Sequence, residues 1–319
     1  MMPRDLDRRL GQVLAGYNRL VRSLPDPLDK KAASLAKALA PDYKNLVEYY
    51  GAKEAFPLLR LPLWLEDKYV SGGLMSARKG YGVKTASAAL YGYLYIRIQD
   101  NVLDEPDMFD PAFLLVGNEF IREFFYILHG LFPPGSPFWG YCTEYWRGTS
   151  SNTLWERQEC GGRLRGFCTE DLARVGGKLD GVKVTVASIC ILAGKEEDIP
   201  RFCAAVDNLN IGSQLHNDVV SFVKDLRHDY FTTVIVNTLG GGETSGEPEE
   251  LFCKASIAAL TGNHLEGWLA KAIEYNEKAL KLLGPGGLPG LDLYVESKNA
   301  HLAGLGRDLV QLKKELLSL

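Results

Sequence analysis

Helical periodicity runs through almost the whole chain of 319 residues and constrains the fold more than any other feature. Apolar residues recur at the spacing of the buried face of an amphipathic helix. No segment alternates convincingly between apolar and polar residues, although the Thr, Val and Ile residues of 232–239 also favour a strand. The pattern predicts helices over 6–24, 32–50, 84–105, 111–132, 183–193, 200–227, 249–260, 265–283 and 291–319.

The composition is compatible with one large domain. Hydrophobic residues make up 46% of the chain, which is enough for a sizeable core. Stretches rich in glycine and proline at 132–138, 239–250 and 283–292 predict loops. None of them is long and polar enough to be a convincing domain linker. We therefore expect a single all-α domain that spans residues 1–319.

Charge and cysteine content exclude several classes of protein. Lys and Arg number 36 against 40 Asp and Glu, and a net charge of −4 makes nucleic acid an unexpected partner. Uncharged apolar stretches fall short of the roughly 20 residues of a transmembrane segment, so none is expected. The first ten residues, MMPRDLDRRL, lack the apolar region of a secretory signal. Six cysteines without a CxxC pair indicate reduced thiols and a cytoplasmic location.

The segment 84–105 is apolar nearly all round and gathers polar residues at its C-terminal end. Asp100 and Asp104 are one helical turn apart and share a face. The C-terminal end of a helix disfavours carboxylates, and burial of unpaired acids is costly. A hard divalent cation such as Mg²⁺ removes both objections, because carboxylate oxygens are its preferred protein ligands. The alternative is an exposed helix end with solvated acids.

A second polar line lies within 214–229. Asn217, Ser221 and Asp225 follow one another at steps of one turn and present amide, hydroxyl and carboxylate oxygens. Such oxygens are suitable ligands for one face of a Mg²⁺ octahedron. An ordinary amphipathic helix with its polar face in water has the same pattern, so this alternative stays open.

Together the two segments resemble the metal motifs of the class I terpene synthases, a branch of the isoprenoid synthase superfamily. QDNVLDEPD (99–107) resembles the aspartate-rich motif, usually DDxxD, and NDVVSFVKD (217–225) resembles the second motif, (N/D)Dxx(S/T)xxxE. The resemblance covers 85–106 and 205–230 and is a matter of helical order elsewhere. Asn101 stands where a second Asp is common, and Asp225 replaces the usual Glu.

The resemblance implies an isoprenoid-synthase-like helical bundle around a central apolar cavity, with three Mg²⁺ ions at its mouth. Two ions would be bound by Asp100 and Asp104, and the third by Asn217, Ser221 and Asp225. The implied diphosphate-binding residues are Arg174, Lys178 and Lys224, with Lys183 as a rival. The expected lining of the substrate pocket is Tyr93, Ile96 and Gly181, with plain core packing as the alternative for Tyr93 and Ile96.

The implied activity is that of a Mg²⁺-dependent terpene synthase. Such a carbon–oxygen lyase ionises a linear isoprenyl diphosphate, here C15 or C20, and cyclises or quenches the carbocation. A second hypothesis is an isoprenyl diphosphate synthase, which adds a homoallylic C5 unit. GGLMSARKG (72–80) distantly resembles the GGKxxR motif of those synthases but lacks its early Lys. A third hypothesis is a catalytically silent helical paralogue that acts as a partner protein. Bundles of this family often pair, which allows a homodimer.

Overall fold

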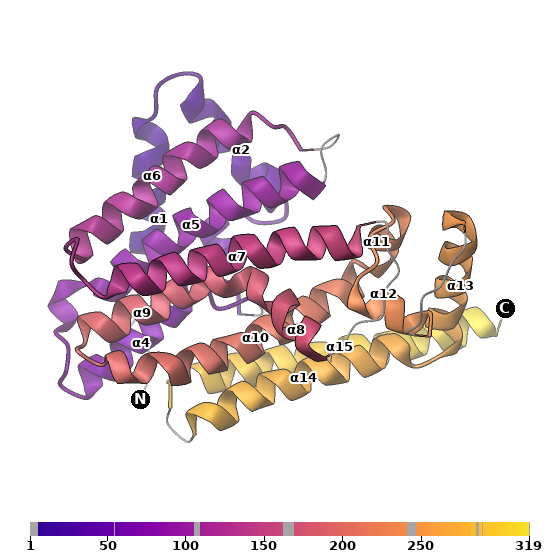
Figure 1. Ribbon diagram of the computed structural model, residues 1–319. Helices are drawn as coiled ribbons and strands as arrows, with labels where there is room; N and C mark the ends of the chain where they lie inside the picture. The colour runs from indigo at the N-terminus through magenta and orange to yellow at the C-terminus, as the bar shows by residue number, and fades with distance from the viewer. Residues whose placement is uncertain are drawn as a thin grey trace. The chain divides into compact units, whose positions relative to one another are not determined.

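The computed structural model describes residues 6–53, 55–104, 109–161, 169–240, 247–284, 287–288 and 290–318. Over these residues it contains fifteen α-helices and three short 3₁₀ segments (Figure 1). The extended pairing within the described ranges is confined to an isolated bridge between Gly161 and Tyr230. The predicted all-α class is therefore confirmed. Among the described helices, none combines the length and hydropathy needed to cross a membrane.

The chain divides into two compact units. Unit 1 comprises Met1–Glu144, Gly181–Pro200 and Leu288–Tyr294. Unit 2 comprises Tyr145–Asp180, Arg201–Gly287 and Val295–Leu319. The single domain expected for 1–319 stays a prediction.

The core of unit 1 forms where α5 packs along α6 and against α1, α4 and α9. Phe120 of α6 lies at its centre, with ring centroids of Tyr91 and Tyr17 at 5.9 and 6.0 Å. Gly117 of α6 faces α5, since a Cβ there would be in ordinary van der Waals contact with Tyr95 and Ile98 at 3.4–3.9 Å. The elements are α1 (Leu6–Ser23), α2 (Leu28–Leu39), α3 (Leu46–Gly51), α4 (Arg60–Ser71), η1 (Ala77–Lys79), α5 (Tyr81–Asp104), α6 (Phe113–Leu131), α9 (Lys183–Leu192) and η3 (Glu196–Asp198).

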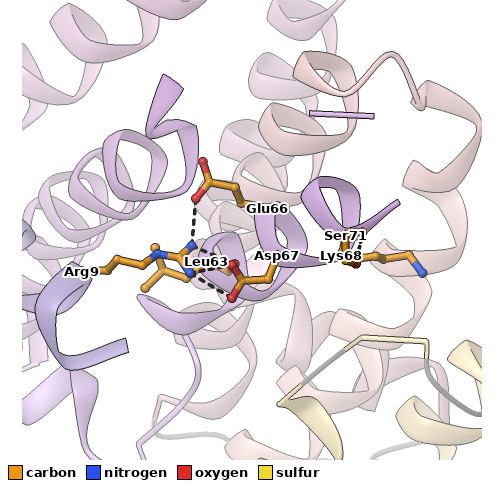
Figure 2. A network of polar contacts seen from close by, with 6 residues as sticks. All are labelled: Arg9, Leu63, Glu66, Asp67, Lys68 and Ser71. Atoms are coloured by element: carbon orange, nitrogen blue, oxygen red, sulfur yellow. Dashed lines mark hydrogen bonds and ion pairs between the residues drawn. The ribbon is translucent and has the colours of Figure 1, made fainter. Parts of the chain in front are cut away.

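A buried ion-pair network joins α1 to α4 in unit 1 (Figure 2). The Arg9 guanidinium donates to Glu66 over 2.8 Å, to Asp67 over 2.8 and 2.9 Å, and to the Leu63 carbonyl over 3.0 Å. Gly82 of α5 covers the pair, because a Cβ there would lie 2.6 Å from Oε2 of Glu66. The arginine is bonded to three groups of one helix and therefore fixes the approach of α1 to α4.

Unit 2 packs α10 against α14 at very short range. Gly212 of α10 makes this possible, since a Cβ there would lie 2.7 Å from Oδ1 of Asn276 and 3.0 Å from the Ala272 carbonyl. α7 (Phe138–Cys160) begins in unit 1 and continues here, and η2 (Gly177–Val182) likewise spans both. α10 (Ile199–Val220) and α15 (Leu291–Leu317) also begin in unit 1 and continue in unit 2. The other elements are α8 (Thr169–Gly176), α11 (Phe222–Arg227), α12 (Thr233–Thr238), α13 (Pro248–Thr261) and α14 (His264–Leu283).

Several elements differ from the sequence prediction. The helix expected over 32–50 is two helices, because Asn45 caps a new start by accepting the Glu48 N–H over 2.8 Å. The segment 232–239, compatible with a strand, forms α12 behind the Thr232 cap. Besides α12, three helices lie outside the predicted ranges. α4 carries Pro62 in its first turn, where proline is tolerated, and α7 and α8 have mostly polar sequences.

Candidate functional site

The acidic end of α5 holds the first predicted pair of metal ligands. α5 is helical through Asp104, so Asp100 and Asp104 share one face as predicted. Asp100 is half-buried and Asp104 is exposed. The last residue of the helix predicted over 84–105 lies outside the described residues. The carboxylates thus stand where a hydrated cation can reach them.

Asp100 is not the unpaired acid assumed from the sequence. Nη1 of Arg97 lies 3.0 Å from its Oδ2, one turn earlier on α5. Burial opposes the charge of Arg97, but the Tyr93 and Asp100 side chains outweigh it, so the pKa of the guanidinium lies above its usual range. Arg97 is therefore a permanent positive charge beside the first motif, and the sequence pattern gave it no role.

Four tyrosines form a continuous edge-to-face row in unit 1. The ring centroids lie 5.0 Å apart for Tyr43 and Tyr49, 4.7 Å for Tyr49 and Tyr50, and 5.2 Å for Tyr50 and Tyr93. Burial, followed by the Tyr93 phenol, raises the pKa of Tyr50 well above its usual value, so it stays neutral. Tyr93 thus packs against α3. Its role as a cavity wall, like that of the half-buried Ile96, stays a prediction.

The second motif is not the continuous helix predicted over 200–227. α10 ends at Val220 and α11 begins at Phe222, with a bend at Ser221. The Ser221 hydroxyl lies within hydrogen-bond distance of the Asp225 carboxylate and 2.9 Å from the Asn217 carbonyl oxygen. Burial raises the pKa of Asp225, and the Ser221 hydrogen bond opposes this. Ser221 and Asp225 lie one helical turn apart at the start of α11, and the Asn217 side chain is exposed.

Asp218 is a buried carboxylate that was not among the predicted ligands. It is 2% exposed and accepts a hydrogen bond from Nε2 of Gln214 over 2.8 Å. Burial, and then the negative charge of Glu156, raises the pKa of Asp218 to about 8. The sequence signal was the second letter of the motif (N/D)Dxx(S/T)xxxE, which Asp218 matches, but the pattern of one-turn steps skips this position.

Glu156 of α7 lies at the centre of a polar cluster in unit 2. It is 3% exposed, and its Oε2 accepts from the Lys178 ammonium and, over 2.7 Å, from the Tyr230 hydroxyl. Because α7 was not predicted as a helix, no pattern in the sequence pointed to Glu156 or Tyr230. Asp218 and Asp225 lie within electrostatic range of this cluster, because the pKa values of both respond to Glu156 and Lys178.

The predicted diphosphate-binding cations have separate surroundings. The guanidinium of Arg174 is exposed and lies over the Trp155 ring, 4.4 Å from its centroid. Lys178 pairs with Glu156, and Lys224 is exposed beside Asp225. Gly181, expected to line the substrate pocket, lies in the 3₁₀ segment η2 between α8 and α9. Among these cations, Lys178 is held in place by the buried carboxylate of Glu156.

Carboxylate, hydroxyl and amide oxygens suit Mg²⁺ by their chemistry. Asp100 and Asp104 offer such oxygens in unit 1, and Ser221 with Asp225 offers them in unit 2. Within the described ranges, no three His, Cys, Asp or Glu side chains gather closely enough to hold a metal by themselves. A cation at either place would complete its shell with water or phosphate oxygens, which is the usual state of Mg²⁺ in proteins.

Comparison with known proteins identifies the fold. No protein-family model matches the chain, and no curated protein matches it. Geranylgeranyl pyrophosphate synthase from Lactobacillus brevis superposes with a TM-score of 0.68 at 14% identity, covering 96% of both chains. Heptaprenyl diphosphate synthase from Staphylococcus aureus gives 0.66 at 13% identity, covering 96% of this chain and 99% of that one. The geranylgeranyl pyrophosphate synthase from Corynebacterium glutamicum, solved with calcium and isoprenyl diphosphate, gives 0.56 at 13% identity, covering 97% and 99%.

The chain therefore has the all-α fold of isoprenyl diphosphate synthases. This finding corrects the expected enzyme class. The prediction of a terpene cyclase, a carbon–oxygen lyase, is wrong, because the solved structures that share the fold are prenyl diphosphate synthases, which are transferases.

Proposed function

We propose that the chain is an isoprenyl diphosphate synthase, a transferase that joins an allylic diphosphate to a homoallylic C5 diphosphate. The observation that carries the proposal is the match over 96% of the chain to prenyl synthases, combined with an acidic helix end at Asp100 and Asp104. The reaction breaks the allylic C–O bond, joins the carbocation to the double bond of the second substrate, and releases a proton and diphosphate.

The described residues supply suitable groups for this chemistry. Asp100 and Asp104 provide oxygen ligands for Mg²⁺, which when bound neutralises the charge that develops on the departing diphosphate. Arg174, Lys178 and Lys224 provide positive charge for diphosphate oxygens. Arg78 and Lys79, both exposed after the C-terminal end of α4, are the candidates for holding the second diphosphate.

The direct test offers purified protein an allylic diphosphate of C5, C10, C15 or C20 with isopentenyl diphosphate and Mg²⁺. Mass spectrometry should find a diphosphate longer by C5 units, and only when both substrates are present. Asp104→Ala should cut turnover by orders of magnitude while circular dichroism stays unchanged, because a metal ligand is lost from an exposed helix end. Product formation without the homoallylic substrate, or none from any pair, would contradict the proposal.

A catalytically silent paralogue is the second candidate. It is favoured by the Arg97 guanidinium beside Asp100, by Asn101 in place of a second Asp, and by the missing early Lys in 72–80. A folded protein that yields no product from any substrate pair, yet binds an active synthase in a pull-down, would establish this candidate.

A further inference from the structure

One carboxylate oxygen of Glu156 accepts hydrogen bonds from two other segments of unit 2. The Lys178 ammonium, from η2, and the Tyr230 hydroxyl, from the segment after α11, both donate to Oε2. One donor is cationic and the other is neutral. Donors that converge in this way on one anionic oxygen form the type of arrangement by which proteins hold a phosphoryl oxygen.

The donors are more accessible than the acceptor. The Lys178 side chain keeps 19% of its exposure, whereas that of Glu156 keeps 4%. Tyr230 is half-buried. The two donor residues are thus the more exposed members of this cluster, and the Glu156 carboxylate is the enclosed one.

We propose that Lys178 and Tyr230 form a two-donor cradle for one phosphoryl oxygen of a diphosphate, and that Glu156 holds that place until the diphosphate arrives. The inference rests on the proposed function and adds Tyr230 to its binding residues. Glu156 is then a positioning residue. It keeps the two donors directed at one point and yields them to the incoming anion.

Backbone contacts keep Tyr230 in place independently of its hydroxyl. The Phe231 N–H donates to the Cys160 carbonyl over 2.9 Å, and Tyr230 bridges to Gly161. The Tyr230 N–H donates to the Asp225 carbonyl over 2.9 Å. Glu156 lies one turn before Cys160 on α7, so these bonds fix the phenol opposite its acceptor. Removal of the hydroxyl alone leaves this anchoring intact.

Two further carboxylates act on the same lysine. Asp218 and Asp225 lie within electrostatic range of Lys178. The Glu156 and Asp225 carboxylates disfavour a bare diphosphate, so the ligand must arrive with a cation that offsets their charge. The appropriate probe is therefore inorganic pyrophosphate in the presence of Mg²⁺.

Isothermal titration calorimetry of the full-length protein with Mg²⁺–pyrophosphate tests the cradle. Lys178→Met should weaken binding at least tenfold, and Tyr230→Phe by several fold. Glu156→Gln should tighten binding by about tenfold, because the competitor for both donors has lost its charge. The matched controls are Tyr126→Phe and Glu144→Gln, which make the same chemical changes at exposed positions. Both controls should bind pyrophosphate like the wild type.

The results separate this inference from the proposed function. Equal pyrophosphate affinities for the wild type, Tyr230→Phe and Glu156→Gln would overturn the cradle and leave the synthase proposal standing. A Glu156→Gln protein that melts earlier but binds pyrophosphate equally well or more weakly would make Glu156 purely structural, and the inference would fall. Failure of every protein, wild type included, to bind Mg²⁺–pyrophosphate would overturn both proposals. If Glu156→Gln does not fold, Glu156→Asp, which retracts the carboxylate by one methylene, should change affinity in the same direction.

Discussion

The Arg97 guanidinium lies 3.0 Å from Oδ2 of Asp100, so the first acid of the aspartate-rich segment already has a cationic partner. The pair is partly exposed, with 45% of the Arg97 side chain and 24% of the Asp100 side chain accessible. Solvent screening makes such a pair weak. It is nevertheless positioned to compete directly with a divalent cation for the same oxygen.

Replacement of Arg97 by Gln should therefore raise the Mn²⁺ or Mg²⁺ affinity of the first motif by about two- to fivefold, the range set by an exposed ion pair. Electron paramagnetic resonance of free Mn²⁺ measures the change without any substrate. Arg122→Gln is the matched control, because it removes the same charge from an exposed pair with Glu119 on α6. An affinity that does not change in Arg97→Gln would show that the guanidinium leaves Asp100 available.

Asp218 should make stability depend on pH in a defined direction. Burial raises its pKa to about 8 in the folded protein, against the ordinary 3.8. The folded state therefore binds the proton more tightly, and this group contributes stability that is lost as pH rises from about 4 to about 8. Asp218→Asn removes this contribution. The unfolding free energy of the variant minus that of the wild type should therefore increase with pH and reach about 1–3 kcal/mol in alkaline buffer.

Urea unfolding of both proteins in chelator-containing buffer, at acidic, neutral and alkaline pH, measures this difference. Burial lowers the pKa of His216 to about 4, which gives a pH dependence of the opposite sign. That contribution is common to both proteins and cancels in the comparison. A difference that stays constant over the pH range would contradict the assignment of a raised pKa to Asp218.

The network around Arg9 should dominate the coupling of α1 to α4. Arg9→Met leaves Glu66 buried without its cation, and loss of one partner from a buried pair costs about 3–5 kcal/mol. Chemical denaturation measures the loss. Arg122→Met, at the exposed pair with Glu119, should cost less than about 1 kcal/mol. Similar small effects for both variants would mean that water reaches Glu66.

Two helical glycines should respond to alanine in opposite ways. Gly212→Ala places a Cβ 2.7 Å from Oδ1 of Asn276 and should destabilise unit 2 by about 1–3 kcal/mol. A Cβ on Gly267 of α14 would meet no heavy atom of the described residues within 4 Å, so Gly267→Ala should stabilise by up to about 1 kcal/mol. Thermal melts of the two variants compare them directly. A neutral Gly212→Ala would show that α10 and α14 can separate without cost.

The fold class could be predicted because helical spacing of apolar residues is a local and repeated signal. α7 was not predicted as a helix because glycines and hydroxyl residues interrupt the helical spacing of its apolar residues. Its packing is supplied by distant groups, as at Gly148, where a Cβ would lie 2.8 Å from Oδ2 of Asp180. Such contacts between segments leave no periodic trace in the sequence.

The same distinction between local signals and tertiary contacts applies to the candidate site. The one-turn relation of Asp100 to Asp104, and that of Ser221 to Asp225, followed from helix geometry alone. The meeting of Glu156 with Tyr230 depends on tertiary structure, so no local motif could encode it. The enzyme class was predicted wrongly for a related reason. A short acidic motif indicates metal binding and ionisation of a diphosphate, but it does not specify how the resulting carbocation reacts.

The hydrogen bond from the Phe231 N–H to the Cys160 carbonyl provides a local probe of opening in unit 2. Phe231 is buried, and its N–H is engaged with the end of α7 rather than within a helix. Deuterium should therefore replace this amide proton only when the segment after α11 detaches from α7. The exchange rate of that one proton would report the local opening of the segment separately from global unfolding.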